Sequence, residues 1–173
     1  MRRPTQRVVR GDWRKRIHHR PDPGGGAGNG GGLTVGPRIL IVDDESSIRT
    51  ICRVNLETDG MAVAEAVDGR DALAAIGRQQ PELVLLDVMM PDVDGWEVAA
   101  QLAADPDTQD IPVVFLSARA AREDKARAQS LGAVGYIVKP FDPVGLGVAV
   151  REVLDRVRRG EREQLNRELY HPE

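Results

Sequence analysis

The chain has a single cysteine and no long apolar run, and each of these scarcities excludes a class of protein. One thiol, Cys52, among 173 residues cannot form an intramolecular disulfide framework. Its helical spacing from Ile48 and Leu56 predicts a buried packing thiol. No apolar run approaches the roughly 18 residues of a membrane span, and the N-terminus lacks the apolar centre of a signal peptide. We therefore expect a cytoplasmic protein with no membrane partner.

Charge is distributed unevenly along the chain. Residues 1–32 carry eight arginines or lysines against two aspartates, a charge of +6, so the net charge of −3 leaves −9 on residues 33–173. This basic segment ends in a glycine-rich run, a composition typical of disorder. Two interpretations stay open. The segment is either a flexible contact to nucleic acid or an acidic partner, helped by Trp13 and the His18–His19 pair, or an inert extension, with translation starting near Val35.

The stretch from Leu83 to Gly95 has the pattern of a reaction centre. Four apolar residues end in Asp87, and turn residues follow at once. A short aliphatic run bounded by proline and glycine predicts a strand buried on both faces, and its carboxyl end emerges where open α/β sheets bind ligands. Taken alone, Asp87 is equally consistent with a loop residue or a helix N-cap.

Three further apolar runs also end in residues that can bind a metal ion or an anion. They are the Asp43–Asp44 pair after residues 38–42, Ser117 after residues 113–116, and Lys139 after residues 134–138. At an effective dielectric near 20, two carboxylates about 4 Å apart repel each other by on the order of 4 kcal/mol, so a cluster of them needs a bound cation or a proton. Ligands that are all oxygen favour Mg²⁺, while the hydroxyl and the ammonium complete an anion site.

These four strand ends, in this order and spacing, resemble the receiver domain of bacterial two-component response regulators over roughly residues 38–158. The roles that the resemblance implies are phosphoacceptor for Asp87, ligands of Mg²⁺ for Asp43, Asp44, Asp87 and the Met89 carbonyl, switch residues for Ser117 and Tyr136, and phosphoryl-contacting cation for Lys139. It also implies a histidine kinase or phosphotransfer protein as donor and a downstream protein as target. A homodimer through the fourth and fifth helices stays open.

The same stretch alternates strands with amphipathic segments, which predicts a parallel sheet covered on both faces. The expected strands are 38–42, 61–65, 82–86, 113–116 and 134–138, and the expected helices lie near 45–58, 68–79, 94–104, 121–131 and 142–158. The fold class is α/β, a CheY-like (flavodoxin-like) doubly wound sheet with strand order 2-1-3-4-5. This order places the ends of the first and third strands side by side.

Periodicity also predicts which helix faces are buried. The first helix shows an apolar stripe of Ile48, Ile51, Cys52 and Leu56. The fourth offers mostly Ala121, Ala126, Ala128 and Leu131, so it should be the least anchored element and the one that a phosphoryl group displaces. By the same resemblance, the Lys139–Pro140 bond is a candidate for the cis form.

The division of the chain follows from these boundaries: a basic arm at 1–37, a receiver domain at 38–158 and a charged tail at 159–173. The tail either prolongs the fifth helix past Gly160 or frays. An output domain with its own core needs at least about 50 residues, so we expect a stand-alone receiver with no nucleic-acid partner other than through the arm.

The expected chemistry is transfer of a phosphoryl group to Asp87, followed by its hydrolysis, which makes the protein a self-modifying switch and not an enzyme with a free substrate. Met89 and Arg119 should flank the hydrolytic water and slow its attack. One alternative is a phosphohydrolase of haloacid-dehalogenase type, which needs a second aspartate where Met89 stands. The other is a phosphate-independent interaction module or a nucleic-acid binder.

Overall fold

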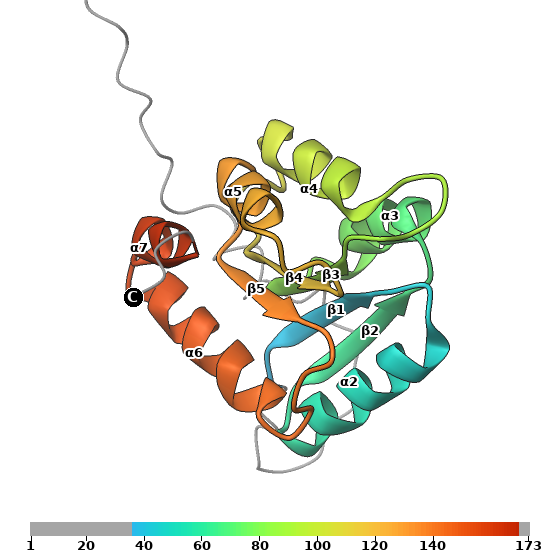
Figure 1. Cartoon of the computed structure of the whole chain (residues 1–173). Helices are drawn as coiled ribbons and strands as arrows, with labels where there is room; N and C mark the ends of the chain where they lie inside the picture. The colour runs from blue at the N-terminus through green and yellow to red at the C-terminus, as the bar shows by residue number, and fades with distance from the viewer. Residues whose placement is uncertain (1–35, 170–173) are drawn as a thin grey trace, which may run out of the picture. The chain divides into compact units, whose positions relative to one another are not determined.

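The computed structural model describes residues 36–169, and its five strands form one parallel sheet in the order β2-β1-β3-β4-β5 (Figure 1). The strands are β1 (Arg38–Val42), β2 (Ala62–Ala66), β3 (Leu83–Asp87), β4 (Val113–Ser117) and β5 (Gly135–Val138). Each lies within one residue of its expected bounds. Every residue of β3 and β4 is buried, because helices cover both faces of the sheet.

Six helices surround the sheet within the described residues: α2 (Ser46–Thr58), α3 (Gly69–Gln79), α4 (Gly95–Ala104), α5 (Arg122–Ser130), α6 (Leu146–Arg158) and α7 (Arg162–Glu168). Helices α3, α4 and α5 lie on one face and α2 and α6 on the other (Figure 1). The core accordingly divides into two clusters, with Leu40 and Leu86 facing the first group of helices and Ile41 and Leu85 facing the second. This alternation is the two-residue period of a strand.

Side-chain caps set the start of the helices that lead away from the sheet's carboxyl edge. Asp68 and Asp94 accept hydrogen bonds from backbone N–H groups in the first turns of α3 and α4, at 2.8 and 2.9 Å. Helix α6 begins at Leu146, four residues later than expected. The reason is local, because the Asp142 carboxylate accepts a hydrogen bond from the Val144 N–H at 3.0 Å and holds a turn in place of the first helical turn.

Two expectations about helix faces need correction. In α2, Cys52 and Leu56 are fully buried as predicted, but Ile51 is 41% exposed, because the stripe that contacts the sheet follows a spacing of four and residue 51 lies beside it. In α5, Ala128 is buried whereas Ala121 is exposed, and the second buried residue of this helix is Asp124. The weak apolar anchoring of α5 is confirmed.

The segment after α6 neither prolongs that helix nor frays. Gly160 adopts a φ of +86° and ends it, and α7 begins two residues later. The Asn166 amide donates to the carbonyls of Gln129 and Ala133 at 2.9 and 2.7 Å, and Leu165 is buried. Helix α7 is therefore fastened to the C-terminal end of α5. The predictions made for residues 1–35 and 170–173 lie outside the described residues.

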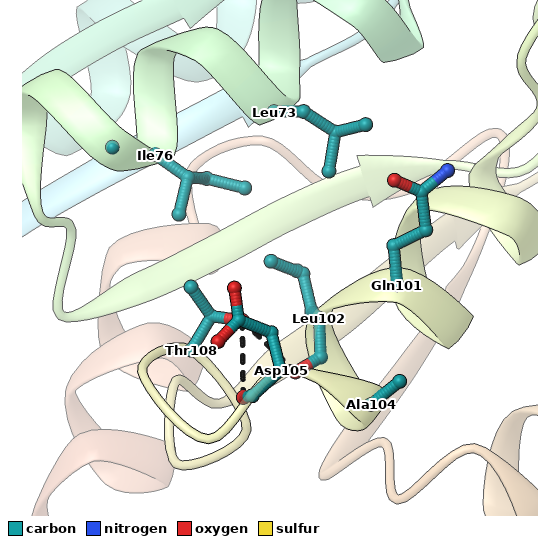
Figure 2. A pocket seen from close by; sticks show the side chains of 8 residues that line it. Leu73, Ile76, Gln101, Leu102, Ala104, Asp105 and Thr108 are labelled. Atoms are coloured by element: carbon teal, nitrogen blue, oxygen red, sulfur yellow. Dashed lines mark hydrogen bonds between the residues drawn. The ribbon is translucent and has the colours of Figure 1, made fainter.

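A hollow of about 500 Å³ lies between α3 and α4, lined by Leu73, Ile76 and Leu102 among others (Figure 2). None of the predicted site residues lines it. None of the helices in residues 36–169 is long and apolar enough to cross a membrane.

Candidate phosphoacceptor site

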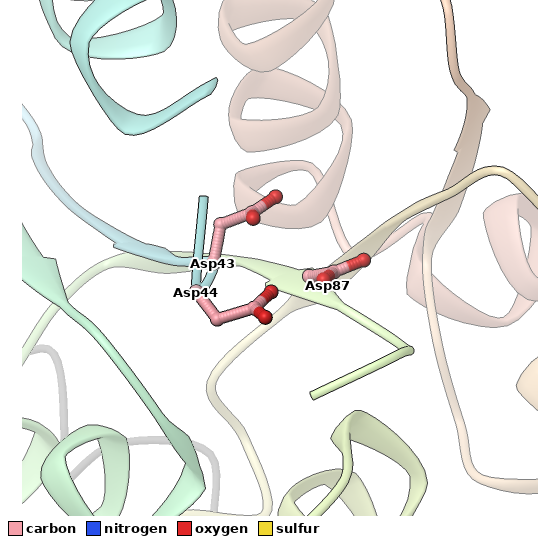
Figure 3. Close-up of side chains that lie close together, drawn as sticks. All are labelled: Asp43, Asp44 and Asp87. Carbon is pink, nitrogen blue, oxygen red and sulfur yellow. The ribbon is translucent and has the colours of Figure 1, made fainter. Parts of the chain in front are cut away.

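Three carboxylates meet at the carboxyl ends of β1 and β3. The two strands pair in parallel with Val42 opposite Leu86, so the residues that follow, Asp43 and Asp87, emerge side by side. One oxygen from each of Asp43, Asp44 and Asp87 lies within 4.8 Å of the others, and Figure 3 shows the three side chains pointing to the same side of the sheet edge. Asp43 and Asp87 are buried, while Asp44 is exposed.

Asp43 is held by its neighbours through all of its oxygen atoms. Its Oδ1 accepts from the Glu45 N–H at 2.9 Å, its Oδ2 from Lys139 Nζ at 2.6 Å, and its backbone carbonyl from Arg49 Nη1 at 2.7 Å. The Arg49 contact fixes the peptide that joins the two acidic residues. Asp43 is therefore fixed by three hydrogen bonds, whereas Asp44 is exposed and still places an oxygen within 4.8 Å of the other two carboxylates.

Lys139 reaches the carboxylates from the end of β5. Its backbone N–H donates to the Ser117 carbonyl at 2.8 Å, and the following bond to Pro140 is cis, as expected. Its ammonium lies 3.3 Å from Asp87 Oδ1 in addition to its contact with Asp43. Burial lowers the pKa of Lys139, but the hydrogen bond and charge of Asp43 and the charge of Asp87 outweigh it, so the pKa lies above its ordinary value.

The electrostatics of Asp87 differ from those of a surface aspartate. Burial and then the charge of Asp43 raise its pKa from 3.8 to about 6, against the opposing effects of Lys139 and the Met89 backbone N–H. At neutral pH the group is still mostly a carboxylate. It is thus a mostly unprotonated carboxylate whose charge is only partly neutralised by its neighbours.

The loop after Asp87 depends on a glycine whose role in the site the sequence analysis did not identify. A Cβ on Gly95 would collide with the Asp87 carbonyl oxygen, and the Gly95 N–H donates to the Val88 carbonyl at 2.9 Å. The start of α4 is therefore packed directly on the backbone of Asp87. The adjacent Asp94-Gly95 pair, a cap followed by a small residue, was the available signal.

The two expected switch residues, Ser117 and Tyr136, both form hydrogen bonds to the backbone of Arg119. The hydroxyl of Ser117 is buried and accepts from the Arg119 N–H at 3.0 Å, and the Tyr136 hydroxyl donates to the Arg119 carbonyl at 2.8 Å. The Tyr136 ring packs on Phe115 with 6.2 Å between centroids. Burial raises the pKa of Tyr136.

The side chains of Met89 and Arg119, expected to flank the site, behave differently. Met89 is 60% exposed beside Asp87. The guanidinium of Arg119 instead pairs with Asp124 of α5, with Nε 3.0 Å from Oδ1. Sequence reasoning missed Asp124, although its spacing of four from Ala128 placed it on the buried face of that helix.

The sequence of this chain matches the family model of the response regulator receiver domain over residues 39–151. The chain belongs to this receiver family. The family inferred from the four strand ends and the predicted strand order 2-1-3-4-5 are both confirmed.

The receiver is similar to several curated proteins that are about twice its length. It is 42% identical over 120 residues to a probable transcriptional regulator, ycf27, of Porphyridium aerugineum, with 69% of this chain and 49% of that protein covered. It is also 42% identical over 123 residues to the DNA-binding dual master transcriptional regulator RpaA of Synechocystis, with 71% and 51% covered. The chain thus spans about half the length of these relatives.

Solved receivers match it over nearly their whole length. The Vibrio cholerae chemotaxis protein CheY4 superposes with a TM-score of 0.65 and 31% identity, covering 68% of this chain and 98% of that one. A CheY-like receiver domain from Methanospirillum hungatei gives a TM-score of 0.67 and 29% identity, with 72% and 98% covered.

Proposed function

We propose that this protein is a response regulator that accepts a phosphoryl group on Asp87 from a histidine kinase or phosphotransfer protein and in response alters a protein-interaction face. One observation carries the proposal. The Asp87 carboxylate stands at the end of β3 in contact with a half-buried ammonium and beside two further carboxylates, and this arrangement suits an oxygen nucleophile with a place for a cation.

The donor set fits Mg²⁺. Three carboxylates and the ammonium of Lys139 leave two negative charges, which a divalent cation balances, and every donor is a hard oxygen. Asp43, Asp44 and Asp87 would hold the ion, with the backbone carbonyl of Met89 as a further ligand. When bound, Mg²⁺ would neutralise charge on the oxygens of the transferred phosphoryl group.

The chain's own residues then account for the transfer. An Asp87 oxygen attacks phosphorus as the bond from phosphorus to the donor's histidine nitrogen breaks, and that nitrogen keeps the electron pair and takes up a proton. The product is an acyl phosphate on Asp87. Lys139, already between Asp43 and Asp87, contacts a phosphoryl oxygen, and the Ser117 hydroxyl donates to another.

The output of this switch is proposed to lie on the face formed by α5, β5 and α6. Helix α5 has only two buried residues, Asp124 and Ala128, and adjoins both switch residues through Arg119. The most weakly anchored helix is thus coupled to the site. This face is also where a downstream protein or a second copy of the chain would bind.

The test is incubation with acetyl phosphate and Mg²⁺ followed by intact-mass measurement. Wild type should gain one phosphoryl group that hydroxylamine removes, and Asp87→Asn should gain none. Asp92→Asn is the matched control, because Asp92 is an exposed aspartate in the same loop, and it should label normally. An adduct of equal yield on Asp87→Asn would contradict the proposal.

A second candidate output is control of transcription, favoured by two observations. The relatives include proteins named as DNA-binding transcriptional regulators, and residues 1–32 carry a charge of +6. The DNA-binding relatives weigh against the expectation that nucleic acid is no partner other than through the basic arm, and the charge of the arm is consistent with that exception. A gel-shift measurement with the full chain and with residues 35–173 separates the two outputs, since DNA binding that depends on the basic segment would support transcriptional control.

A further inference from the structure

The most connected residue near the site is Arg119. Its N–H donates to the Ser117 hydroxyl, its carbonyl accepts from the Tyr136 hydroxyl, and its guanidinium pairs with the Asp124 carboxylate. Arg119 thus joins the end of strand β4, the edge strand β5 and helix α5. In Figure 1, α5 lies beside β5 and α4.

The ion pair with Asp124 matters because α5 has little else to hold its first turn. The helix has no side-chain N-cap, and its only apolar residue that is fully buried is Ala128. The Asp124 side chain is 9% exposed, whereas that of Arg119 is 52% exposed. Among the residues that the structure describes, Arg119 is the cation paired with this carboxylate.

A phosphoryl group on Asp87 would compete for the same guanidinium. Asp87 lies opposite Leu116 in the β3–β4 ladder, so the group would emerge next to Ser117, and the Arg119 backbone nitrogen is 3.0 Å from the Ser117 hydroxyl. About half of the Arg119 side-chain surface is exposed, so the guanidinium has room to rotate away from Asp124. A phosphate group with nearly two charges is the stronger anion and accepts two parallel hydrogen bonds from a guanidinium.

Resting on the proposed function of Asp87, we propose that Arg119 exchanges Asp124 for the phosphoryl group and thereby releases the first turn of α5. The exchange leaves Asp124 as a buried carboxylate without its cation. That state is unfavourable, and the helix relieves it by moving the carboxylate into water. Arg119 thus has two positions, and phosphorylation selects the one in which α5 is loose.

The chain contains its own reporter for this movement. Arg127 of α5 lies over the ring of Trp96 of α4, 4.8 Å from its centroid, and Trp96 packs on Phe115 at 4.7 Å. Arg127 lies in the last turn of α5, so release of the first turn tilts the helix about its fastened C-terminal end and moves the cation relative to the indole; Trp96 fluorescence should therefore change. The full chain carrying Trp13→Phe makes Trp96 the only fluorescent indole.

Three variants in that background test the exchange. Asp124→Asn removes the resting partner but keeps the shape, Arg119→Ala removes the cation itself, and Glu123→Gln removes a charge from the exposed side of the same turn as a control. Each is phosphorylated with acetyl phosphate and Mg²⁺, and adduct formation, adduct decay after donor removal and Trp96 fluorescence are followed.

Asp124→Asn should label about threefold to tenfold faster than wild type, the range expected when an ion pair with one buried member no longer holds the resting state. Its resting fluorescence should resemble that of phosphorylated wild type, and its adduct should last at least as long. Arg119→Ala should show the same resting fluorescence but a shorter-lived adduct, because the phosphoryl group has lost its cation. Glu123→Gln should match wild type.

The exchange predicts different adduct lifetimes for the two variants: unchanged or longer for Asp124→Asn and shorter for Arg119→Ala. A merely structural ion pair would change both lifetimes in the same way. Labelling and fluorescence of Asp124→Asn equal to those of wild type would overturn the exchange while leaving Asp87 as the phosphoacceptor. Equal lifetimes in Asp124→Asn and Arg119→Ala would also overturn it. No adduct on wild type would instead refute the proposed function, and the exchange with it.

Discussion

Lys139 Nζ lies 2.6 Å from Asp43 Oδ2 and makes a longer contact of 3.3 Å with Asp87 Oδ1. The lysine is therefore engaged mainly by Asp43, and the carboxylate proposed to react stays partly unneutralised. This division explains why burial and Asp43 raise the pKa of Asp87 to about 6 even though a cation is in contact with it.

The raised pKa predicts a pH-dependent instability in metal-free protein. Because the folded-state pKa of Asp87, about 6, exceeds its unfolded value of 3.8, its stabilising contribution is present below pH 3.8 and is lost as pH rises through 6. Urea unfolding in EDTA should show Asp87→Asn about 1 to 3 kcal/mol more stable than wild type near pH 8, with the gap closing near pH 4. A gap that does not change with pH would contradict this account.

Replacing Lys139 tests the other member of the pair. Lys139→Ala leaves three carboxylates without their ammonium, so its free energy of unfolding in EDTA should fall by about 2 to 4 kcal/mol. Added Mg²⁺ should still bind and recover most of the loss, whereas phosphorylation should no longer alter Trp96 fluorescence. Lys125→Ala, on α5, is the control and should change stability little. Normal fluorescence switching in Lys139→Ala would show that the lysine has no role in coupling.

The ends of the strands could be predicted because each strand is specified by a short local run of apolar residues. Four or five apolar residues in a row specify a strand buried on both faces, and parallel pairing carries Asp43 and Asp87 to one edge whatever the loops do. The fold and the acidic cluster followed from those runs. The roles of individual residues in the cluster stay predictions.

Other features depend on contacts between distant segments, and no local pattern reports them. Arg119 was expected to flank the hydrolytic water, and only the packing of α5 reveals its partner Asp124. The docking of α7 rests on Asn166, whose hydrogen-bond partners lie more than thirty residues away. Gly147 had no explanation from sequence, yet a Cβ there would collide with the Asp59 carboxylate.

Alanine substitutions at Gly95 and Gly77 serve as test and control, because an added Cβ is crowded at the first position and unhindered at the second. Gly95→Ala forces a methyl group against the Asp87 backbone, so unfolding free energy should fall by about 2 kcal/mol or more and phosphorylation by acetyl phosphate should slow. Gly77 lies within α3 with nothing within 4 Å of its added Cβ, and Gly77→Ala should stabilise by up to about 1 kcal/mol with normal labelling. Thermal unfolding and intact mass check both. Similar behaviour of the two variants would show that Gly95 does not support the loop.

The α5–α7 contact predicts a stability effect far from the acidic cluster. Asn166→Ala removes one of the two donors to the Gln129 carbonyl and the side-chain donor to the Ala133 carbonyl, so the free energy of unfolding should fall by about 1 to 3 kcal/mol, and amide exchange should rise in α7 and at the end of α5. Asn55→Ala removes an exposed hydrogen bond within α2 and is the control. Unchanged exchange in α5 would show that α7 does not restrain it.

Met89 should determine how long the phosphoryl group lasts. Its side chain is 60% exposed next to Asp87, where a thioether cannot orient a water molecule for attack on phosphorus. An amide at the same place can accept a hydrogen bond from that water, so Met89→Asn should shorten the lifetime of the adduct several-fold. Met89→Leu keeps an apolar side chain of similar size and should decay like wild type. Decay is followed by intact mass after removal of acetyl phosphate, and equal lifetimes in all three proteins would mean that the water reaches phosphorus without meeting residue 89.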